Sequence, residues 1–292
     1  MGLPEIFISF QTAAVSAITR SARGVLAVAV KDATAGGAAE AAYKSLAEVP
    51  EDKFSPENYR LLKLAFLAAP TKVWVLRVGE DAEKTYQALE RLRFDWLAAP
   101  GLEDARVMSF IKTLRNGGRG VKAVVANAKA PDCEGIVNLC VSGLTLEDGA
   151  MEAKDYAVRV AALLAALPLT RSATYANLPE VVGCDALAEP DADVDAGKLI
   201  IVPGREGYRL GRAVNSLTTL TPDKAAPFQK IKIVEGIDLI RGDIAKAFES
   251  GYVGKVLNDY DNKLLLVTAI NAYLAQKNES ETEFPYTIFH LI

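Results

Sequence analysis

Two periods alternate along this chain, one with apolar residues at every second position and one with apolar residues at every third or fourth. A period of two is typical of a β-strand and a period near 3.6 of an α-helix. In the first half we expect strands in 24–30, 72–78, 94–100, 121–127 and 135–141. We expect helices in 55–68, 81–93, 102–116 and 153–167, and an alanine-rich segment near 37–48 belongs to the same series. Strands that alternate with helices predict an α/β fold with a largely parallel sheet.

The second half continues with the same two periods. Residues 185–196 predict an acidic loop, and residues 198–210 predict two short strands joined by a turn. Residues 228–234 alternate like a strand that leads into a helix. Two helical stripes follow, formed by Ile237, Ile240, Ile244 and Phe248, and then by Leu266, Val267, Ile270, Tyr273 and Leu274. Such stripes predict packing surfaces rather than reactive groups.

Both ends of the chain carry apolar alternation that stands apart from this series. Residues 2–10 (GLPEIFISF) read as a strand, and the small, polar segment 11–23 separates them from the rest. The other end closes with EFPYTIFHLI at 283–292. A strand at a sheet edge leaves backbone donors and acceptors that need partners. Either these strands fold back onto the chain's own sheet, or another subunit receives them.

Composition excludes several classes of protein. Half of the residues are hydrophobic and 24% are charged, enough for a large core with a polar surface. The 37 acidic and 33 basic residues leave a net charge of −4, without the basic excess that binding to nucleic acid needs. The longest apolar stretch, 157–169, contains Arg159 and is shorter than the roughly 20 residues of a membrane span. We therefore expect neither nucleic acid nor a membrane as a partner.

Reactive side chains are few. Cys133, Cys140 and Cys184 show no C-x-x-C spacing, which favours reduced thiols over disulfides or a zinc site. The single histidine is His290, so a catalytic triad would depend on a residue two places from the end. No basic segment precedes Arg20, so the start does not resemble a secretory signal. These features predict a soluble cytosolic protein without a cofactor.

Two glycine-rich stretches match nucleotide-binding loops only in part. RNGGRG at 115–120 follows a predicted helix and precedes a strand, the reverse of the order in a dinucleotide-binding loop. GYVGKV at 251–256 has Val256 where a phosphate-binding loop places a magnesium-binding Ser or Thr. We expect turns at both places.

Acidic and hydroxyl side chains also favour structural roles. Asp259 and Asp261 open a segment like a calcium loop, but Leu264 stands where the loop needs glycine, so a helix start is expected. The acidic residues of 185–195 favour an exposed loop over a cation site, because like charges separate most easily in water. The Ser/Thr cluster of 216–221 has no adjacent base, which favours turn capping over nucleophilic chemistry.

Three stretches carry a resemblance to a known family. They are GLPEIFISF…AITRSARGVLAVAVKD at the start, VAALLAALPLTRSATYANLPEV in the middle, and RAVNSLTTLTPDKAAPFQKIKIVEGIDLIRGDI…GYVGKVLNDYDNKLLLVTAI near the end. Together they closely resemble the contractile tail sheath proteins of myophages, and most of all the compact type in phage-like elements and contractile bacteriocins of Gram-positive bacteria. The resemblance extends to about residue 277, and its most specific part is 212–270.

This resemblance implies a non-enzymatic subunit without a cofactor. Its fold would be a sheath-type core of mixed sheet and flanking helices with an extended N-terminal strand arm. Subunits would stack as six-membered rings in a helical sleeve around an inner tail tube, and contraction would drive the tube through a cell envelope. Partners would be other sheath subunits by strand exchange, the tube protein, and baseplate and tail terminator proteins. Assembly would take place in the bacterial host cytoplasm, before the tail of a phage or phage-like particle is released.

The resemblance also implies roles for particular residues. The arm that adds a strand to a neighbouring subunit comprises Pro4, Glu5, Ile6, Phe7, Ile8, Ser9 and Phe10. A C-terminal strand would contain Phe284, Tyr286, Ile288 and His290. This end departs from the family pattern after residue 277, so it either substitutes for the usual strand or prevents complete polymerisation. Residues that would face the tube are Lys255, Asp259, Asp261 and Lys263.

The resemblance divides the chain into four parts: an arm (1–20), an α/β sheath domain (21–195), a conserved sheath core (196–277) and an atypical tail (278–292). Two other readings stay open at this stage. A nucleotide-binding α/β enzyme would need a phosphate loop or a convergent acid/base set. A baseplate adaptor could use the same sheath core.

Overall fold

The computed structural model describes residues 23–280, and for residues 276–280 only the backbone. Within this range the chain forms two units, which we call the body unit (residues 23–236) and the helical unit (residues 237–280). Each is described by itself.

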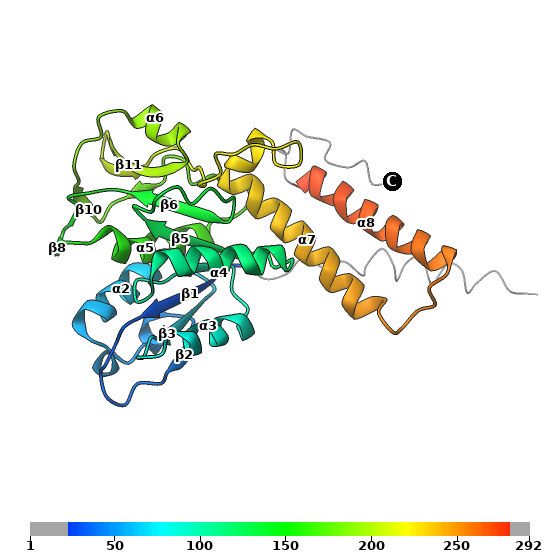
Figure 1. Cartoon of the computed structure of the whole chain (residues 1–292), viewed down its shortest axis with the longest axis horizontal. Coiled ribbons are helices and arrows are strands. Elements are labelled where there is room, and N and C mark those ends of the chain that lie inside the picture. Colours follow the sequence, from blue (N-terminus) through cyan, green and yellow to red (C-terminus); the bar gives the residue numbers. More distant parts are fainter. Residues whose placement is uncertain (1–22, 281–292) are drawn as a thin grey trace, which may run out of the picture. The chain divides into compact units, whose positions relative to one another are not determined.

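A nine-stranded mixed sheet forms the centre of the body unit (Figure 1). Its strands, in spatial order, are β2 (Glu40–Tyr43), β3 (Lys72–Arg77), β1 (Val25–Val30), β4 (Trp96–Ala98), β5 (Lys122–Ala126), β6 (Ile136–Cys140), β11 (Lys198–Gly204), β12 (Gly207–Leu210) and β9 (Asn177–Leu178). The six strands from β3 to β11 are parallel, whereas β2, β12 and β9 pair antiparallel with their neighbours. The predicted α/β fold with a mainly parallel sheet is confirmed.

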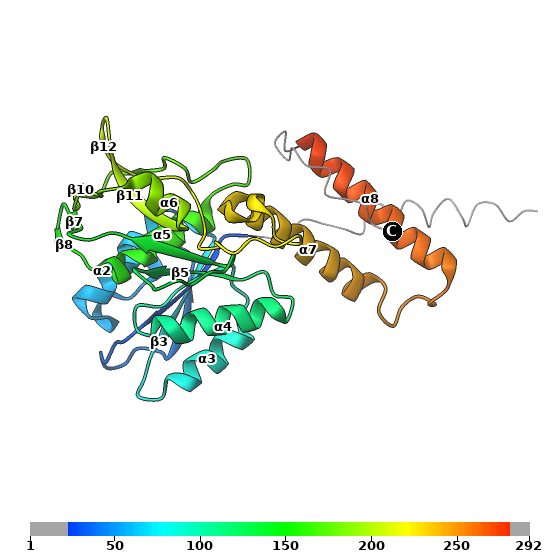
Figure 2. The same cartoon turned by 45° about the horizontal axis from the view of Figure 1, so that its top comes forward.

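Helices cover both faces of this sheet (Figures 1 and 2). Helices α2 (Pro56–Phe66) and α5 (Ala153–Ala166) pack on one face, and α3 (Ala82–Arg91) and α4 (Asp104–Asn116) pack on the other. Alternate residues of β1 enter the two cores: Leu26, Val28 and Val30 join the first, and Ala27 and Ala29 join the second. Burial on both faces explains why the parallel strands are continuously apolar.

Smaller elements extend the body unit. A second sheet contains β10 (Val181–Gly183), β7 (Thr145–Leu146) and β8 (Gly149–Ala150), in that order. Three short 3-10 helices occupy Leu46–Glu48, Glu51–Lys53 and Ala226–Gln229. Helix α4 ends at Asn116 with Gly117 as its C-cap, and Gly118 has a φ of +90°, so RNGGRG forms a turn as predicted.

One predicted strand is wrong. Residues 228–234 form the end of a 3-10 helix followed by the start of α7 (Ile231–Gly251). Ile231, Ile233 and Val234 are all buried there. Their spacing reflects a helical turn buried on several sides, not one face of a strand.

Two further segments differ from the sequence prediction. The alanine-rich segment contains the edge strand β2, which pairs antiparallel with β3. The acidic segment contains a short helix, α6 (Pro190–Asp195), instead of being a loop throughout. Proline suits a first helical turn, and the carboxylates of Asp191 and Asp193 lie where the helix dipole favours negative charge.

The helical unit contains most of α7 and all of α8 (Tyr260–Ser280), which run in opposite directions (Figure 1). Both predicted helices are confirmed, but their buried faces differ from the predicted stripes. From residue 237 on, the buried residues of α7 are Leu239, Asp243 and Ala247, while Phe248 is exposed. Within the described residues no helix is long and apolar enough to span a bilayer.

Candidate interaction surface

The carboxyl ends of the parallel strands are where α/β folds usually bind ligands, at the point where strand order reverses. Here that point lies between β1 and β4. The amide of Gly101 donates to the carbonyl of Ala29 at 2.9 Å, and a Cβ on Gly101 would lie 2.7 Å from the backbone nitrogen of Lys31. Only glycine permits so close an approach of two backbones. The loop after β4 therefore covers the end of β1.

Asp32 follows β1 at this edge of the sheet and serves the local structure. Its carboxylate accepts hydrogen bonds from the backbone amides of Thr34 at 2.9 Å and Ser55 at 3.0 Å, and from the side chain of Asn58 at 2.8 Å. Burial raises the pKa of Asp32, but these hydrogen bonds outweigh that effect and lower the pKa to about 2. A carboxylate this weakly basic is a poor general base near pH 7.

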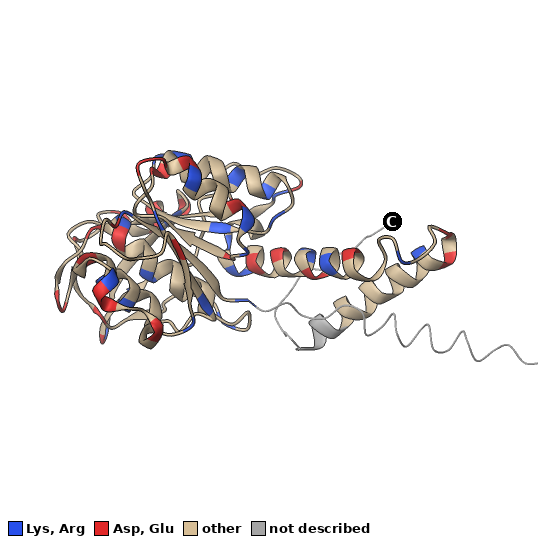
Figure 3. Cartoon of the chain, turned by 90° about the horizontal axis from the view of Figure 1, so that it is seen from below, with Lys and Arg blue, Asp and Glu red and all other residues tan. Residues whose placement is uncertain are grey.

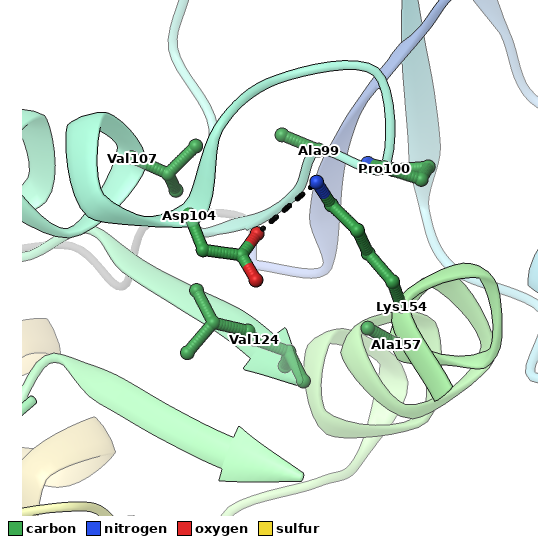
Figure 4. Close-up of a pocket in the computed structure, with 8 residues that line it drawn as sticks. Ala99, Pro100, Asp104, Val107, Val124, Lys154 and Ala157 are labelled. Carbon is green, nitrogen blue, oxygen red and sulfur yellow. Dashed lines mark ion pairs between the residues drawn. The ribbon is translucent and has the colours of Figure 1, made fainter. Parts of the chain in front are cut away.

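A small pocket lies beside the same edge (Figure 4). Lys154 reaches across it, with its Nζ 3.5 Å from an Asp104 carboxylate oxygen and 2.5 Å from the Leu102 carbonyl, to which it donates. The other lining residues are Ala99, Pro100, Val107, Val124, Val125 and Ala157. The pocket thus offers one ion pair between apolar walls. In the part of the chain that the structure describes, no three His, Cys, Asp or Glu side chains gather into a metal site.

The Ser/Thr cluster serves the local structure: Thr221 Oγ1 accepts from the Lys224 amide at 3.1 Å and so caps a turn, as predicted, while the other residues make long-range hydrogen bonds. Ser216 Oγ donates to the Cys133 carbonyl at 3.0 Å and accepts from the Cys133 amide at 3.3 Å. The carboxylate of Asp132 accepts from the amides of Thr218 and Thr219 at 2.8 and 3.0 Å. Hydrogen bonds from Thr219 and Thr218 lower the pKa of Asp132, and burial raises the pKa of the Cys133 thiol. These groups hold the chain before β6 to the loop that follows β12.

The four residues proposed to face the tube lie around the turn between α7 and α8, and all are exposed. Lys255 donates to the carbonyl of Ser250, which closes the end of α7. Asp259 accepts from the Asn262 amide at 2.9 Å and so caps α8, which confirms the predicted helix start. Asp261 and Lys263 lie in the first turn of α8. Two of the four charges therefore have a structural role.

The same turn exposes an apolar surface that the sequence did not predict. We call it the apolar tip, and its residues are Phe248, Val253, Val256, Leu257, Tyr260, Leu264 and Val267. Leu257 and Tyr260 are each 77% exposed. Figure 3 shows that α8 beyond its first turn carries few charged residues, unlike the evenly charged α7. A surface of this kind is typical of a site that another molecule covers.

One signal in the sequence could have indicated the apolar tip. Segment 251–263 contains glycines, asparagines and aspartates that predict a turn, yet Val253, Val256, Leu257 and Tyr260 are interspersed among them. Apolar residues in a turn have no helical or strand face to bury. The predicted arm residues 4–10 and the C-terminal strand residues 284–290 lie outside the described residues.

The chain matches no protein-family model. It is 36% identical to the tail sheath protein of Clostridium phage phiCD119, over 96% of this chain and 82% of that protein. Among solved structures, the sheath tail protein from Listeria innocua superposes with a TM-score of 0.78 at 18% identity, covering 97% of this chain and 90% of that one. The contracted helical sheath of the anti-feeding prophage superposes with a TM-score of 0.72 at 13% identity, covering 91% and 81%.

Some relatives are longer than this chain. The match to the phage-like element PBSX protein XkdK of Bacillus subtilis is 32% identical but spans 39% of that protein, and the match to YqbK of the same organism spans 46%. The match to the phage phiCD119 protein, in contrast, spans most of both chains, and the sheath structures share the arrangement of sheet and helices. The resemblance seen in the sequence is therefore confirmed, and this chain belongs to the tail sheath protein family.

Proposed function

We propose that copies of this protein stack as six-membered rings in a helical sleeve around an inner tube, and that contraction of the sleeve drives the tube through a cell envelope. The observation that carries the proposal is the apolar tip on a member of the sheath family. Large apolar side chains clustered in water are costly, and proteins that act as monomers rarely keep them exposed. An assembly in which another protein covers the tip removes this cost.

In this proposal the apolar tip faces the inner tube. The four charged residues beside it are two lysines and two aspartates, so they carry no net charge. Balanced charges orient a docking partner and reject wrong ones more than they add affinity. We therefore assign the affinity to apolar burial at the tip, and the orientation to Lys255, Asp259, Asp261 and Lys263.

Residues 1–20 act as the linking arm in this proposal, with residues 4–10 adding a strand to a neighbouring subunit. Main-chain hydrogen bonds would supply affinity, and the alternating Ile6, Ile8 and Phe10 would set the register. The nine residues 2–10, when extended, reach about 30 Å, far enough to cross to a neighbour. Residues 284–290 would supply a second, weaker strand.

The proposed role is structural and needs no cofactor. The usual ligand position of the α/β fold is covered by the loop at Gly101, and Asp32 is committed to backbone amides, which supports a body unit built for packing. Baseplate and tail terminator proteins would bind the two ends of the sleeve. Assembly would take place in the bacterial host cytoplasm, before the particle is released.

Deletion of residues 2–10 tests the proposal. We expect a folded subunit with unchanged circular dichroism that forms no tubes in negative-stain electron microscopy. As a matched control, Ile6→Ser with Ile8→Ser keeps the arm's length and backbone donors, and should weaken tube formation without abolishing it. Tubes of normal length from the deletion variant, or loss of the body's fold, would overturn the role of the arm.

A further inference from the structure

The chain enters β1 through Arg23 and Gly24, and unusually many contacts hold this point. The amides of Gly24 and Val25 both donate to one carboxylate oxygen of Asp95, at 2.8 and 2.9 Å. The hydroxyl of Thr71 donates to the Arg23 carbonyl at 2.7 Å. Gly24 has a φ of +93°, and a Cβ there would lie 2.7 Å from Thr71 Oγ1, so only glycine fits.

The side chain of Arg23 extends the same cluster to another element. It forms an ion pair with Glu235, which lies in the first turns of α7, and only 14% of the arginine side chain and 7% of the glutamate side chain are exposed. Lys122 Nζ lies 3.0 Å from the other oxygen of Glu235, and 5.5 Å from the centre of the buried Trp96 ring. One buried carboxylate thus joins α7 to the start of β1 and to the start of β5.

Strand register explains why these residues meet. Leu26 of β1 pairs with Trp96 of β4, and Trp96 pairs with Lys122 of β5. The backbone of Asp95 continues both ladders, since its amide donates to the Val25 carbonyl at 2.8 Å and its carbonyl accepts from the Lys122 amide at 3.0 Å. With Thr71 directly before β3, the cluster lies at the amino-terminal ends of four parallel strands, β3, β1, β4 and β5, at the opposite edge from the pocket of Figure 4.

We propose that this cluster is an arm-root clamp, formed by Arg23, Gly24, Thr71, Asp95, Lys122 and Glu235, that couples the chain before Arg23 to helix α7. The coupling rests on the proposed function of residues 1–20 as a linking arm. A pull on the arm reaches β1 and α7 together, because Arg23 and Glu235 share one buried ion pair. Beyond the clamp, β1 is hydrogen-bonded to β3 on one side and β4 on the other, so the load spreads over two ladders.

Burial makes the coupling effective. Glu235 is shared by two cations, so loss of the Arg23 charge reduces its charge compensation although Lys122 stays, and loss of the Glu235 charge withdraws a buried counter-charge from both cations. If Arg23 loses its charge, Glu235 and the first turns of α7 should loosen; if Glu235 loses its charge, the start of β1 should loosen. Coupling between two sites is reciprocal in this way.

Amide hydrogen exchange on isolated full-length subunits tests this reciprocity. We expect Arg23→Met to speed exchange in residues 232–238, and Glu235→Gln to speed exchange in residues 24–26, each by about tenfold or more. Arg171→Met, which neutralises an exposed arginine of the body unit, should change neither segment. Strand β6 should keep its protection in all variants, which separates loosening of the clamp from a general loss of stability.

The clamp is refuted if each substitution speeds exchange only in its own segment, or in neither. If Arg23→Met does not fold, the nearly isosteric Glu235→Gln provides the decisive comparison. Thr71→Val, which removes only the hydroxyl donated to Arg23, should then speed exchange in residues 24–26 to a smaller extent. Hydrogen exchange is measured on isolated subunits and needs no tubes. The clamp can therefore be refuted while deletion of residues 2–10 still abolishes assembly, and the role of the arm can be refuted while the exchange data still support the clamp.

Discussion

The phenol of Tyr273 in α8 donates a 2.5 Å hydrogen bond to the carboxylate of Asp243 in α7, and only 5% and 1% of these residues are exposed. The bond joins the two helices of the helical unit through a polar contact between buried positions. A buried carboxylate is stable only when it is hydrogen-bonded, so this pair fixes which faces of α7 and α8 point inward.

Tyr273→Phe removes the phenol while keeping the ring. We expect it to lower the free energy of unfolding by about 1.5–3 kcal/mol, since the bond goes to a charged group and its acceptor stays buried. Chemical denaturation followed by circular dichroism measures the loss. Tyr260→Phe is the matched control, because Tyr260 is 77% exposed and its hydroxyl should contribute little. Equal effects of the two substitutions would contradict the importance of the Tyr273–Asp243 bond.

The same pair shows where sequence patterns stop being informative. The apolar stripe of Ile237, Ile240, Ile244 and Phe248 predicted the helix correctly but misplaced its buried face. An aspartate at position 243 reads as a solvent-facing residue until Tyr273, thirty positions away, is known to donate to it. Burial of a charged group depends on a partner from another element, and a period along one helix carries no information about that partner.

The parallel strands of the main sheet were predictable because apolar residues bury them on both faces, as in β1 and β5. The short edge strands β2 and β9 are partly exposed and were not predicted. The second sheet was not predictable from local pattern. Strand β7 has two residues and pairs across a long stretch of sequence, with Val181 opposite Leu146. So short a strand is defined by its partner rather than by a period of its own. The arm-root clamp depends in the same way on residues from five separate segments, at the starts of β1, β3, β4 and β5 and in α7.

Asp32 should make the stability of the body unit depend on pH at the acid end. Its pKa falls from the ordinary value of 3.8 to about 2 in the folded chain, so the folded state favours the ionised form. The resulting stabilisation, about 2 kcal/mol, is present above pH 4 and lost as pH falls from about 4 to about 2. Unfolding free energies measured between pH 5 and pH 2 check this.

Asp32→Asn supplies the control for that titration. The variant should be less stable than the original protein at pH 5, because the amide accepts hydrogen bonds with one oxygen and carries no charge. The difference should shrink as pH falls through the window, since only the original protein loses a charge at this position. A difference in unfolding free energy that stays constant down to pH 2 would mean that another group causes the loss of stability at acid pH.

Two ion pairs of similar geometry should differ strongly in their contribution to stability. Arg159 Nε donates to Glu180 at 2.7 Å with 7% and 12% of the side chains exposed, and Tyr156 donates to the same oxygen at 2.7 Å. Arg60 Nε donates to Asp148 at 2.7 Å, but 27% and 58% of those side chains are exposed. Water already solvates the Arg60–Asp148 pair. The buried Arg159 and Glu180 depend instead on each other and on Tyr156 for hydrogen bonds.

Glu180→Gln should therefore lower the free energy of unfolding by about 3–5 kcal/mol, because it leaves Arg159 buried without a counter-charge. Asp148→Asn should lower it by less than about 1 kcal/mol. Thermal and chemical denaturation of the two variants side by side check the ratio. Comparable losses would show that burial of the Arg159–Glu180 pair does not govern its contribution.

Substitution of the apolar tip separates its role in assembly from any role in folding. Leu257→Ser with Tyr260→Ser should change the free energy of unfolding by less than about 0.5 kcal/mol, because both side chains are largely exposed in the subunit. If the tip is buried against the inner tube, the same pair should weaken tube binding by at least about tenfold, since burying one large apolar side chain is worth about 1.5–3 kcal/mol. Cosedimentation with purified tubes measures this.

Lys255→Ala with Lys263→Ala is the control for charge and should have the smaller effect. A larger loss from the lysine pair would assign the affinity to charge and leave the exposed apolar residues without the role proposed for them.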